Sequence, residues 1–230
     1  METGGKLSVV GTPIGNLEDI TLRALRTLKE ADVIYCEDTR VTAKLLAHYE
    51  IETPLKRLDA NVEAEKAGEV IERLEVGEHV VYVSDAGTPG ISDPGVRLVH
   101  FVREYLPAAI IEAIPGPSAL ATALSIAGTK TDDGFVFWGF PPHKKGRKTL
   151  MEKVAAEPRT QVLYESSHRI VKLCSELAEV LGEREVLFAR ELTKHFEEVR
   201  AGSASELAVF LEENAEHQKG EFVVIISPIS

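Results

Sequence analysis

The first half of the chain alternates short apolar runs with longer segments of helical periodicity. The apolar runs have the length and the β-branched content of strands that are buried on both faces. They cover residues 7–11, 33–36, 80–84 and 109–114. Between them, apolar residues recur every three or four positions, as at Ala67, Val70 and Leu74. Strands that alternate with helices in this way predict a parallel sheet with helices on both faces.

The helical segments of this half are expected near residues 22–28, 42–48, 63–74, 95–104 and 117–127. In the first of them, Leu22, Leu25 and Leu28 are spaced as one apolar face. Asp19 and Thr21 are both candidates for its N-cap, because their side-chain oxygens can accept a hydrogen bond from the first turn.

The pattern changes after Thr129, where apolar runs follow one another more closely. They cover residues 135–140, 161–164, 186–189, 197–201 and 221–226, with helical patterns at residues 168–181 and 205–212. Strands that are close together in the sequence favour a mixed sheet over a purely parallel one. We therefore expect two α/β domains, residues 1–129 with a mostly parallel sheet and residues 130–230 with a mixed sheet.

Composition and charge narrow the class of protein. The chain has 230 residues, with 26 Lys and Arg against 37 Asp and Glu, so its formal charge is −11. This acidic balance argues against non-specific coating of nucleic acid and against binding to an anionic membrane. Residues 1–6 lack the apolar core of a signal peptide, and no window reaches the roughly 20 apolar residues of a membrane span. A cytoplasmic protein with no membrane partner is expected.

The cysteines and histidines give no sign of a metal centre. Cys36 and Cys174 are far apart, and the seven histidines show no paired ligand spacing. We expect no disulfide and no structural metal, with both cysteines in the core.

Three loops rich in glycine and proline follow predicted strands. The longest covers residues 84–95, and shorter ones cover residues 11–16 and 115–119. Ligands of open α/β sheets bind at the carboxyl ends of the strands, where these loops would meet. Each loop alone is also compatible with a plain turn. The glycine spacing of the longest loop matches neither a dinucleotide-binding fingerprint nor a Walker A loop.

Charged residues that follow two strands are candidates for catalysis. Glu37, Asp38 and Arg40 come directly after the second strand, and Glu165 follows a strand of the second half. A carboxylate there can act as a general base or favour a cationic ligand. Asp38 is equally suited to cap the next helix.

A basic run interrupts the acidic chain at Lys144, Lys145, Arg147 and Lys148. Such a cluster is either a solvated loop or a contact for phosphate groups, which bind cations without reading sequence. The local reversal of charge favours the second interpretation.

The ordered set of motifs resembles the small-subunit ribosomal RNA methyltransferases of the tetrapyrrole methylase superfamily. The resemblance covers residues 7–226 and rests on nine segments in order: TPIGN (12–16), EDTR (37–40), SDAGTP (84–89), SDPG (92–95), PGPS (115–118), YES (164–166), HR (168–169), RELTK (190–194) and KGE (219–221).

This resemblance implies a two-domain fold with S-adenosylmethionine in the cleft between the domains. It implies 2′-O-methylation of a cytidine in small-subunit ribosomal RNA, either free or within the assembling subunit, by a homodimer. It also implies nine cofactor-binding residues: Pro13, Asp85, Gly87, Thr88, Ser118, Ala119, Tyr164, Leu192 and Gly220.

The chain departs from the family pattern in one segment. A His-Asn-Glu sequence is common after the third strand of these proteins, whereas residues 59–63 here read DANVE, which keeps Asn61 and lacks the histidine. Longer relatives also continue into a further C-terminal module.

Other functions remain compatible with the residues. They are methylation of a corrinoid or of a protein, a nicotinamide-dependent oxidoreductase, and a nucleotide-binding module without catalysis.

Overall fold

The computed structural model describes residues 5–59 and 63–229, which form two compact units. The first unit is Met1–Ser118 and the second is Ala119–Ser230. The division falls one helix earlier than the boundary expected after residue 129. Helix α5 (Ala119–Ala127) belongs to the second unit because it contacts strand β10 (Glu221–Ile226).

The first unit contains a parallel sheet, as the sequence predicts. Its strand order is β3-β2-β4-β1-β5. Its strands are β1 (Lys6–Val10), β2 (Val33–Cys36), β3 (Leu55–Arg57), β4 (His79–Val83) and β5 (Ile110–Ile114). Its helices are α1 (Leu22–Glu30), α2 (Thr39–His48), α3 (Glu63–Glu75) and α4 (Val96–Tyr105), with a short 3-10 turn at Leu17–Asp19.

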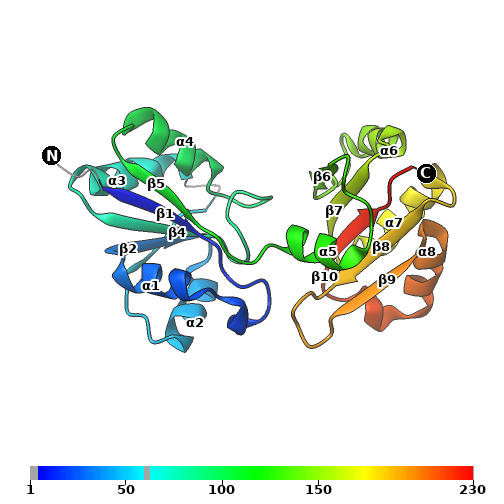
Figure 1. Cartoon of the computed structure of the whole chain (residues 1–230), viewed down its shortest axis with the longest axis horizontal. Helices are drawn as coiled ribbons and strands as arrows, with labels where there is room; N and C mark the ends of the chain where they lie inside the picture. The colour runs from blue at the N-terminus through cyan, green and yellow to red at the C-terminus, as the bar shows by residue number, and fades with distance from the viewer. Residues whose placement is uncertain (1–4, 60–62, 230) are drawn as a thin grey trace. The chain divides into compact units, whose positions relative to one another are not determined.

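The helices cover both faces of this sheet (Figure 1). Because successive side chains of a strand point to opposite faces, Val81 and Val83 of β4 pack in the core formed with α1 and α2. Val80 and Tyr82 pack in the core formed with α3 and α4. The carboxyl ends of the strands therefore form one edge that is left to the connecting loops.

The second unit contains a mixed sheet, as the sequence also predicts, and its strand order is β6-β7-β10-β8-β9. Only the β6–β7 pair is parallel. The remaining strands are β6 (Phe135–Gly139), β7 (Thr160–Ser166), β8 (Glu185–Arg190) and β9 (Glu198–Ser203). Its other helices are α6 (Arg147–Ala156), α7 (Ile170–Leu181) and α8 (Ala204–Glu213), followed by a 3-10 turn at Ala215–Gln218.

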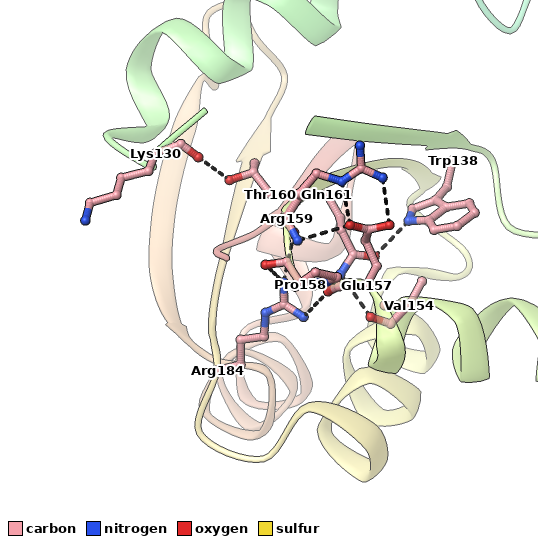
Figure 2. A network of polar contacts seen from close by, with 9 residues as sticks. All are labelled: Lys130, Trp138, Val154, Glu157, Pro158, Arg159, Thr160, Gln161 and Arg184. Carbon is pink, nitrogen blue, oxygen red and sulfur yellow. Dashed lines mark hydrogen bonds and ion pairs between the residues drawn. The ribbon is translucent and has the colours of Figure 1, made fainter. Parts of the chain in front are cut away.

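Helices α6, α7 and α8 bury one face of this sheet. Polar side chains on that face are paired, as burial requires. Trp138 Nε1 donates to Gln161 Oε1 at 2.8 Å, and Gln161 Nε2 donates to the carbonyl of Val154 at 2.9 Å (Figure 2).

Both cysteines are buried, and burial and the charge of Glu165 raise the pKa of Cys174 to about 12.

Some local expectations differ from the structure. Leu22 is 86% exposed, so its predicted place on the buried face is wrong, and the fully buried apolar residues of α1 are Ala24 and Leu28. Thr21, not Asp19, caps this helix by accepting from the amide of Ala24. Among the described residues, no helix is long and apolar enough to cross a membrane.

Candidate functional site

The three Gly/Pro-rich loops meet at the carboxyl edge of the first sheet and are joined by hydrogen bonds. Thr12 and Gly87 exchange two backbone bonds of 2.9 and 3.1 Å, which link the loops after β1 and β4. Thr88 Oγ1 donates to the carbonyl of Pro117 at 3.1 Å, which adds the loop after β5. The loops expected to face one ligand are thus one connected structure, and it contains Pro13, Asp85 and Ser118 as well.

Glycines allow two of these loops to touch through their backbones. A Cβ atom on Gly116 would lie 2.7 Å from the carbonyl oxygen of Gly11, and one on Gly11 would lie 2.9 Å from Gly116. Gly87 adopts a φ of +78°, which L-residues with side chains rarely adopt. The glycines therefore let the loops pack tightly against one another, which fixes the shape of this sheet edge.

Several carboxylates lie beside this loop edge. The amide of Asp38 donates to Asp85 Oδ1 at 2.9 Å, which ties the loop after β2 to the central loop. Burial, together with the charges of Asp85, Asp93, Asp59 and Asp38, raises the pKa of Glu37. Glu37 thus lies in a negative field, which favours either a bound proton or a cationic ligand.

Asp38 and Arg40 have a clear local role. Asp38 is the N-cap of α2, since its Oδ1 accepts from the amide of Arg40 at 2.8 Å. The two side chains also form an ion pair of 2.5 Å. The hydrogen bonds from Arg40 lower the pKa of Asp38 to about 2. The helix-cap alternative is therefore confirmed for Asp38, and the structure shows Arg40 as its partner.

In the second unit, Tyr164 is held from two sides. The amide of Leu120, in the first turn of α5, donates to its hydroxyl oxygen at 3.0 Å. The rings of Phe137 and Phe140 pack edge-on against it, with centroid distances of 4.9 and 5.4 Å. Ala119, a further expected cofactor residue, begins the same helix turn.

The loop after β8 carries unusual backbone conformations around Leu192. Glu191 and Thr193 have φ values of +50° and +67°. Such conformations cost free energy and cluster at ligand sites. Gly220 lies against this loop, because a Cβ atom there would be 2.4 Å from Cγ of Glu191. Leu192 and Gly220, expected from separate motifs, are thus brought together.

Glu165 does not lie at an accessible surface. It is 1% exposed, and its Oε1 lies 2.6 Å from Arg169 Nη2. Its Oε2 lies 3.8 Å from Arg147 Nη1. A carboxylate that is buried between two guanidinium groups has no path to a substrate proton.

Arg147 differs from the other cations of the basic run. Lys144, Lys145 and Lys148 are exposed, whereas Arg147 is 5% exposed and also pairs with Glu176 at 2.7 Å. The structure therefore gives Arg147 an internal role. The sequence motifs assign no role to Arg169 or Glu176. The i,i+4 spacing of Glu165 and Arg169 is the sequence signal that could have predicted their ion pair.

The departure from the family pattern at residues 59–63 falls mostly outside the described side chains. Asp59, which is described, is buried and forms an ion pair with Arg57. Among the described residues, no group of three His, Cys, Asp or Glu side chains could hold a metal ion.

Comparison with known proteins places the chain in a family. The family model described as Tetrapyrrole (Corrin/Porphyrin) Methylases matches residues 6–208. A protein of Pseudomonas aeruginosa named Ribosomal RNA small subunit methyltransferase I is 43% identical over 98% of this chain and 79% of its own length. A protein of the same name from Thermotoga maritima is 42% identical over 97% of this chain and 98% of its own length.

Solved structures share the fold. Uroporphyrin-III-C-methyltransferase of Thermus thermophilus superposes with a TM-score of 0.66 at 22% identity, covering 97% of this chain and 94% of its own. Cobalt precorrin-4 methyltransferase superposes with a TM-score of 0.69 at 21% identity, covering 96% and 94%. With its two sheets, its joined loops and this family match, the chain belongs to the tetrapyrrole methylase family.

Proposed function

We propose that this protein transfers a methyl group from S-adenosylmethionine to the 2′-oxygen of a cytidine in small-subunit ribosomal RNA. The observation that carries the proposal is the identity of 42–45% to proteins named Ribosomal RNA small subunit methyltransferase I, over nearly the whole chain. The joined loops support it, because they gather at one sheet edge beside several carboxylates.

The residues present fit S-adenosylmethionine. The negative charges around Glu37 suit the cationic sulfonium of this cofactor. Thr193 Oγ1 is buried without a hydrogen-bond partner in the described part of the chain, so it is free to bond a polar ligand. We propose that two sets of residues hold the cofactor: Pro13, Asp85, Gly87, Thr88 and Ser118 in the first unit, and Ala119, Tyr164, Leu192 and Gly220 in the second.

When bound, S-adenosylmethionine supplies an electrophilic methyl group. The chain would contribute mainly by orienting the acceptor, since good orientation alone can lower a barrier by about 7–11 kcal/mol. Glu37 is the best-placed base for the ribose hydroxyl, because its raised pKa matches proton acceptance better than the lowered pKa of Asp38. Asp38, Arg40 and Glu165 would have structural roles and would not take part in the chemical step.

Lys144, Lys145 and Lys148 are proposed to hold the RNA backbone. They are exposed and close in sequence, and α6 begins within the same run. Phosphates bind both to lysines and to the free amides of a helix N-terminus. The remainder of this acidic chain would discourage stray contacts with RNA.

The direct test is transfer of labelled methyl groups to small ribosomal subunits that lack the modification, compared with naked ribosomal RNA. We expect label on one cytidine, mapped by nuclease protection of its 2′-O-methylated linkage. Label on a corrinoid or on a protein, with none on RNA, would overturn the proposal in favour of another methylase activity.

The role of the lysines is tested by changing Lys144, Lys145 and Lys148 together to Glu. RNA affinity should be lost while affinity for S-adenosylmethionine, measured by calorimetry, is kept. A matched control changes the exposed Lys29, Lys44 and Lys153 to Glu, which alters the net charge equally. Equal loss of RNA affinity in both variants would show that net charge, not this loop, governs binding.

We also propose that the protein acts as a cytoplasmic homodimer, on the strength of the family resemblance. Analytical ultracentrifugation of the full chain across its working concentrations tests the dimer, and a single monomeric species would contradict it.

A further inference from the structure

Next to the lysines in the second unit, four charged side chains form a cluster that is largely buried. Glu165 is in contact with Arg169 at 2.6 Å and with Arg147 at 3.8 Å, and Arg147 continues to Glu176 at 2.7 Å. Glu165, Arg147 and Arg169 have side chains only 0%, 6% and 15% exposed. The cluster therefore lies inside the second unit, under the segment that carries the lysines.

Both arginines of this cluster also bind the backbone of that segment. Arg169 Nη1 donates to the carbonyl of Pro141 at 2.9 Å. Arg147 Nη1 donates to the carbonyl of Pro142 at 3.1 Å. The amide of Arg147 donates to the carbonyl of Lys144 at 3.2 Å. We call residues 141–146 the basic loop. The two arginines hold its start through the carbonyls of Pro141 and Pro142, and the amide of Arg147 holds its end through the carbonyl of Lys144.

The cluster is poorly explained by stability alone. Removing charges from water is costly, and well-packed apolar residues often replace a buried ion pair without loss of stability. Within the described part of the chain, Glu165 Oε2, Arg147 Nη2 and Arg169 Nε accept or donate no hydrogen bond. What apolar side chains could not reproduce is the pair of directional bonds to the carbonyls of Pro141 and Pro142.

We propose that Glu165 is a positioning residue, which holds Arg147 and Arg169 so that they fix the basic loop and present its lysines to RNA phosphates. This inference rests on the proposed function for the identity of the ligand. Glu165 was expected to be a catalytic residue; in this inference it supports substrate binding instead.

The first test is Glu165→Gln in the full chain. We expect affinity for a ribosomal RNA fragment to fall at least about tenfold. The slope of log affinity against log salt should become shallower by about 1.4, since the loop carries two lysines and each lost lysine contact removes about 0.7. Affinity for S-adenosylmethionine and kcat at saturating RNA should stay within about twofold, so that KM for RNA alone rises. A general base would instead show a fall in kcat.

Arg184→Met is the matched control. Arg184 likewise donates to backbone carbonyls, those of Glu157 and Arg159 at 2.9 Å each (Figure 2). These carbonyls lie outside the basic loop. It should lower the melting temperature and leave the salt slope of RNA binding unchanged. A changed slope in this control would mean that any loss of stability in the unit weakens RNA binding, which would overturn the inference.

A second variant separates positioning from stability. Arg147→Met, Glu165→Leu and Arg169→Met combined replace the cluster with apolar side chains, which should restore the melting temperature relative to Glu165→Gln. RNA affinity should remain low, because the carbonyls of Pro141 and Pro142 have lost their donors. Recovery of RNA affinity together with stability would overturn the positioning role.

Hydrogen exchange keeps this inference separate from the proposed function. In Glu165→Gln, the amides of residues 143–147 should exchange at least about tenfold faster, while those of β8 are unchanged. Unchanged exchange in the loop overturns the inference even if the wild-type protein methylates RNA. If the wild-type protein neither binds nor methylates RNA, the proposed function fails, whereas faster exchange would still confirm that the cluster fixes the loop.

Discussion

Single carboxylates in this protein behave differently because their partners differ. Asp38 has a guanidinium partner and a pKa lowered to about 2, whereas burial and the charges of nearby carboxylates raise the pKa of Glu37, its neighbour in sequence. Glu165 is enclosed by two arginines. Adjacent acidic residues of one motif, Glu37 and Asp38, can therefore serve as a base candidate and a helix cap, while Glu165 of another motif serves as a positioning residue.

Glu37→Gln should lower kcat at least about 100-fold if Glu37 accepts the ribose proton. The wild-type rate should rise with pH through a pKa above the ordinary glutamate value of 4.5 and then level off, because the carboxylate is the active form. Single-turnover methyl transfer from pH 4 to 8 measures both. A fall of less than threefold would exclude Glu37 as the base.

The same substitution should affect stability in the opposite direction. A raised pKa in the folded state means that stability is lost as pH rises through that pKa. Glu37→Gln removes this loss, so the variant should unfold at a higher urea concentration than the wild type at pH 7, with the difference disappearing toward pH 4. Equal midpoints at pH 7 would contradict the raised pKa of Glu37.

Glu69 should contribute stability that acid removes. Hydrogen bonds from Lys56 and Lys66 lower its pKa to about 2. A lowered pKa means that the contribution is complete above the unfolded value near 4.3 and is lost as pH falls toward 2. Between pH 5 and pH 2.5, the wild type should lose about 1 kcal/mol more than Glu69→Gln, allowing for solvent screening. Parallel pH profiles of the two proteins would contradict this.

At the scale of elements, the loops after β1 and β5 depend on two facing glycines. Gly116→Ala would place a methyl group 2.7 Å from the carbonyl oxygen of Gly11 and push the loops apart. We expect affinity for S-adenosylmethionine to fall at least about tenfold (about 1.4 kcal/mol), as measured by calorimetry.

Gly68→Ala is the control for that change. Gly68 lies in α3, is exposed, and has no atom within 4 Å of an added Cβ. Alanine there should raise the free energy of unfolding by about 0.5–1 kcal/mol and leave cofactor affinity unchanged. If both variants bind the cofactor like the wild type, close contact of the two loops is not needed for the site.

At the scale of the whole molecule, aromatic side chains provide a separate fluorescence probe of unfolding for each unit. Its single tryptophan, Trp138, reports the second unit, and four of its five tyrosines lie in the first. If residues of both units hold S-adenosylmethionine, the cofactor should stabilise both units. At a cofactor concentration of 100 times its Kd, the free energy of unfolding should rise by about 2.7 kcal/mol. The Trp138-monitored melting midpoint should then rise.

NAD at the same concentration should leave the Trp138-monitored midpoint unchanged, because the glycine spacing does not match a dinucleotide fingerprint. A midpoint that S-adenosylmethionine leaves unchanged, although calorimetry shows binding, would confine the cofactor to the first unit.

Local periodicity by itself determined most of the architecture. Runs such as Val33–Cys36 and Glu221–Ile226 coincide with strands, because buried strands need continuous apolar residues. Helix α6 was not predicted, because one of its three buried positions is a charged residue, Arg147. Strand β3 was missed as well, since it has only three residues and none is fully buried.

The meeting of the three Gly/Pro-rich loops at one edge also followed from the sequence, since parallel strands align their carboxyl ends. Only the tertiary structure decided the roles of individual charges. Arg147 and Glu165 lie 18 positions apart (165 − 147) on different elements, and their burial depends on how α6 packs over β7. Spacing along a chain reports which residues share a face, whereas the pairing of charges depends on contacts between faces.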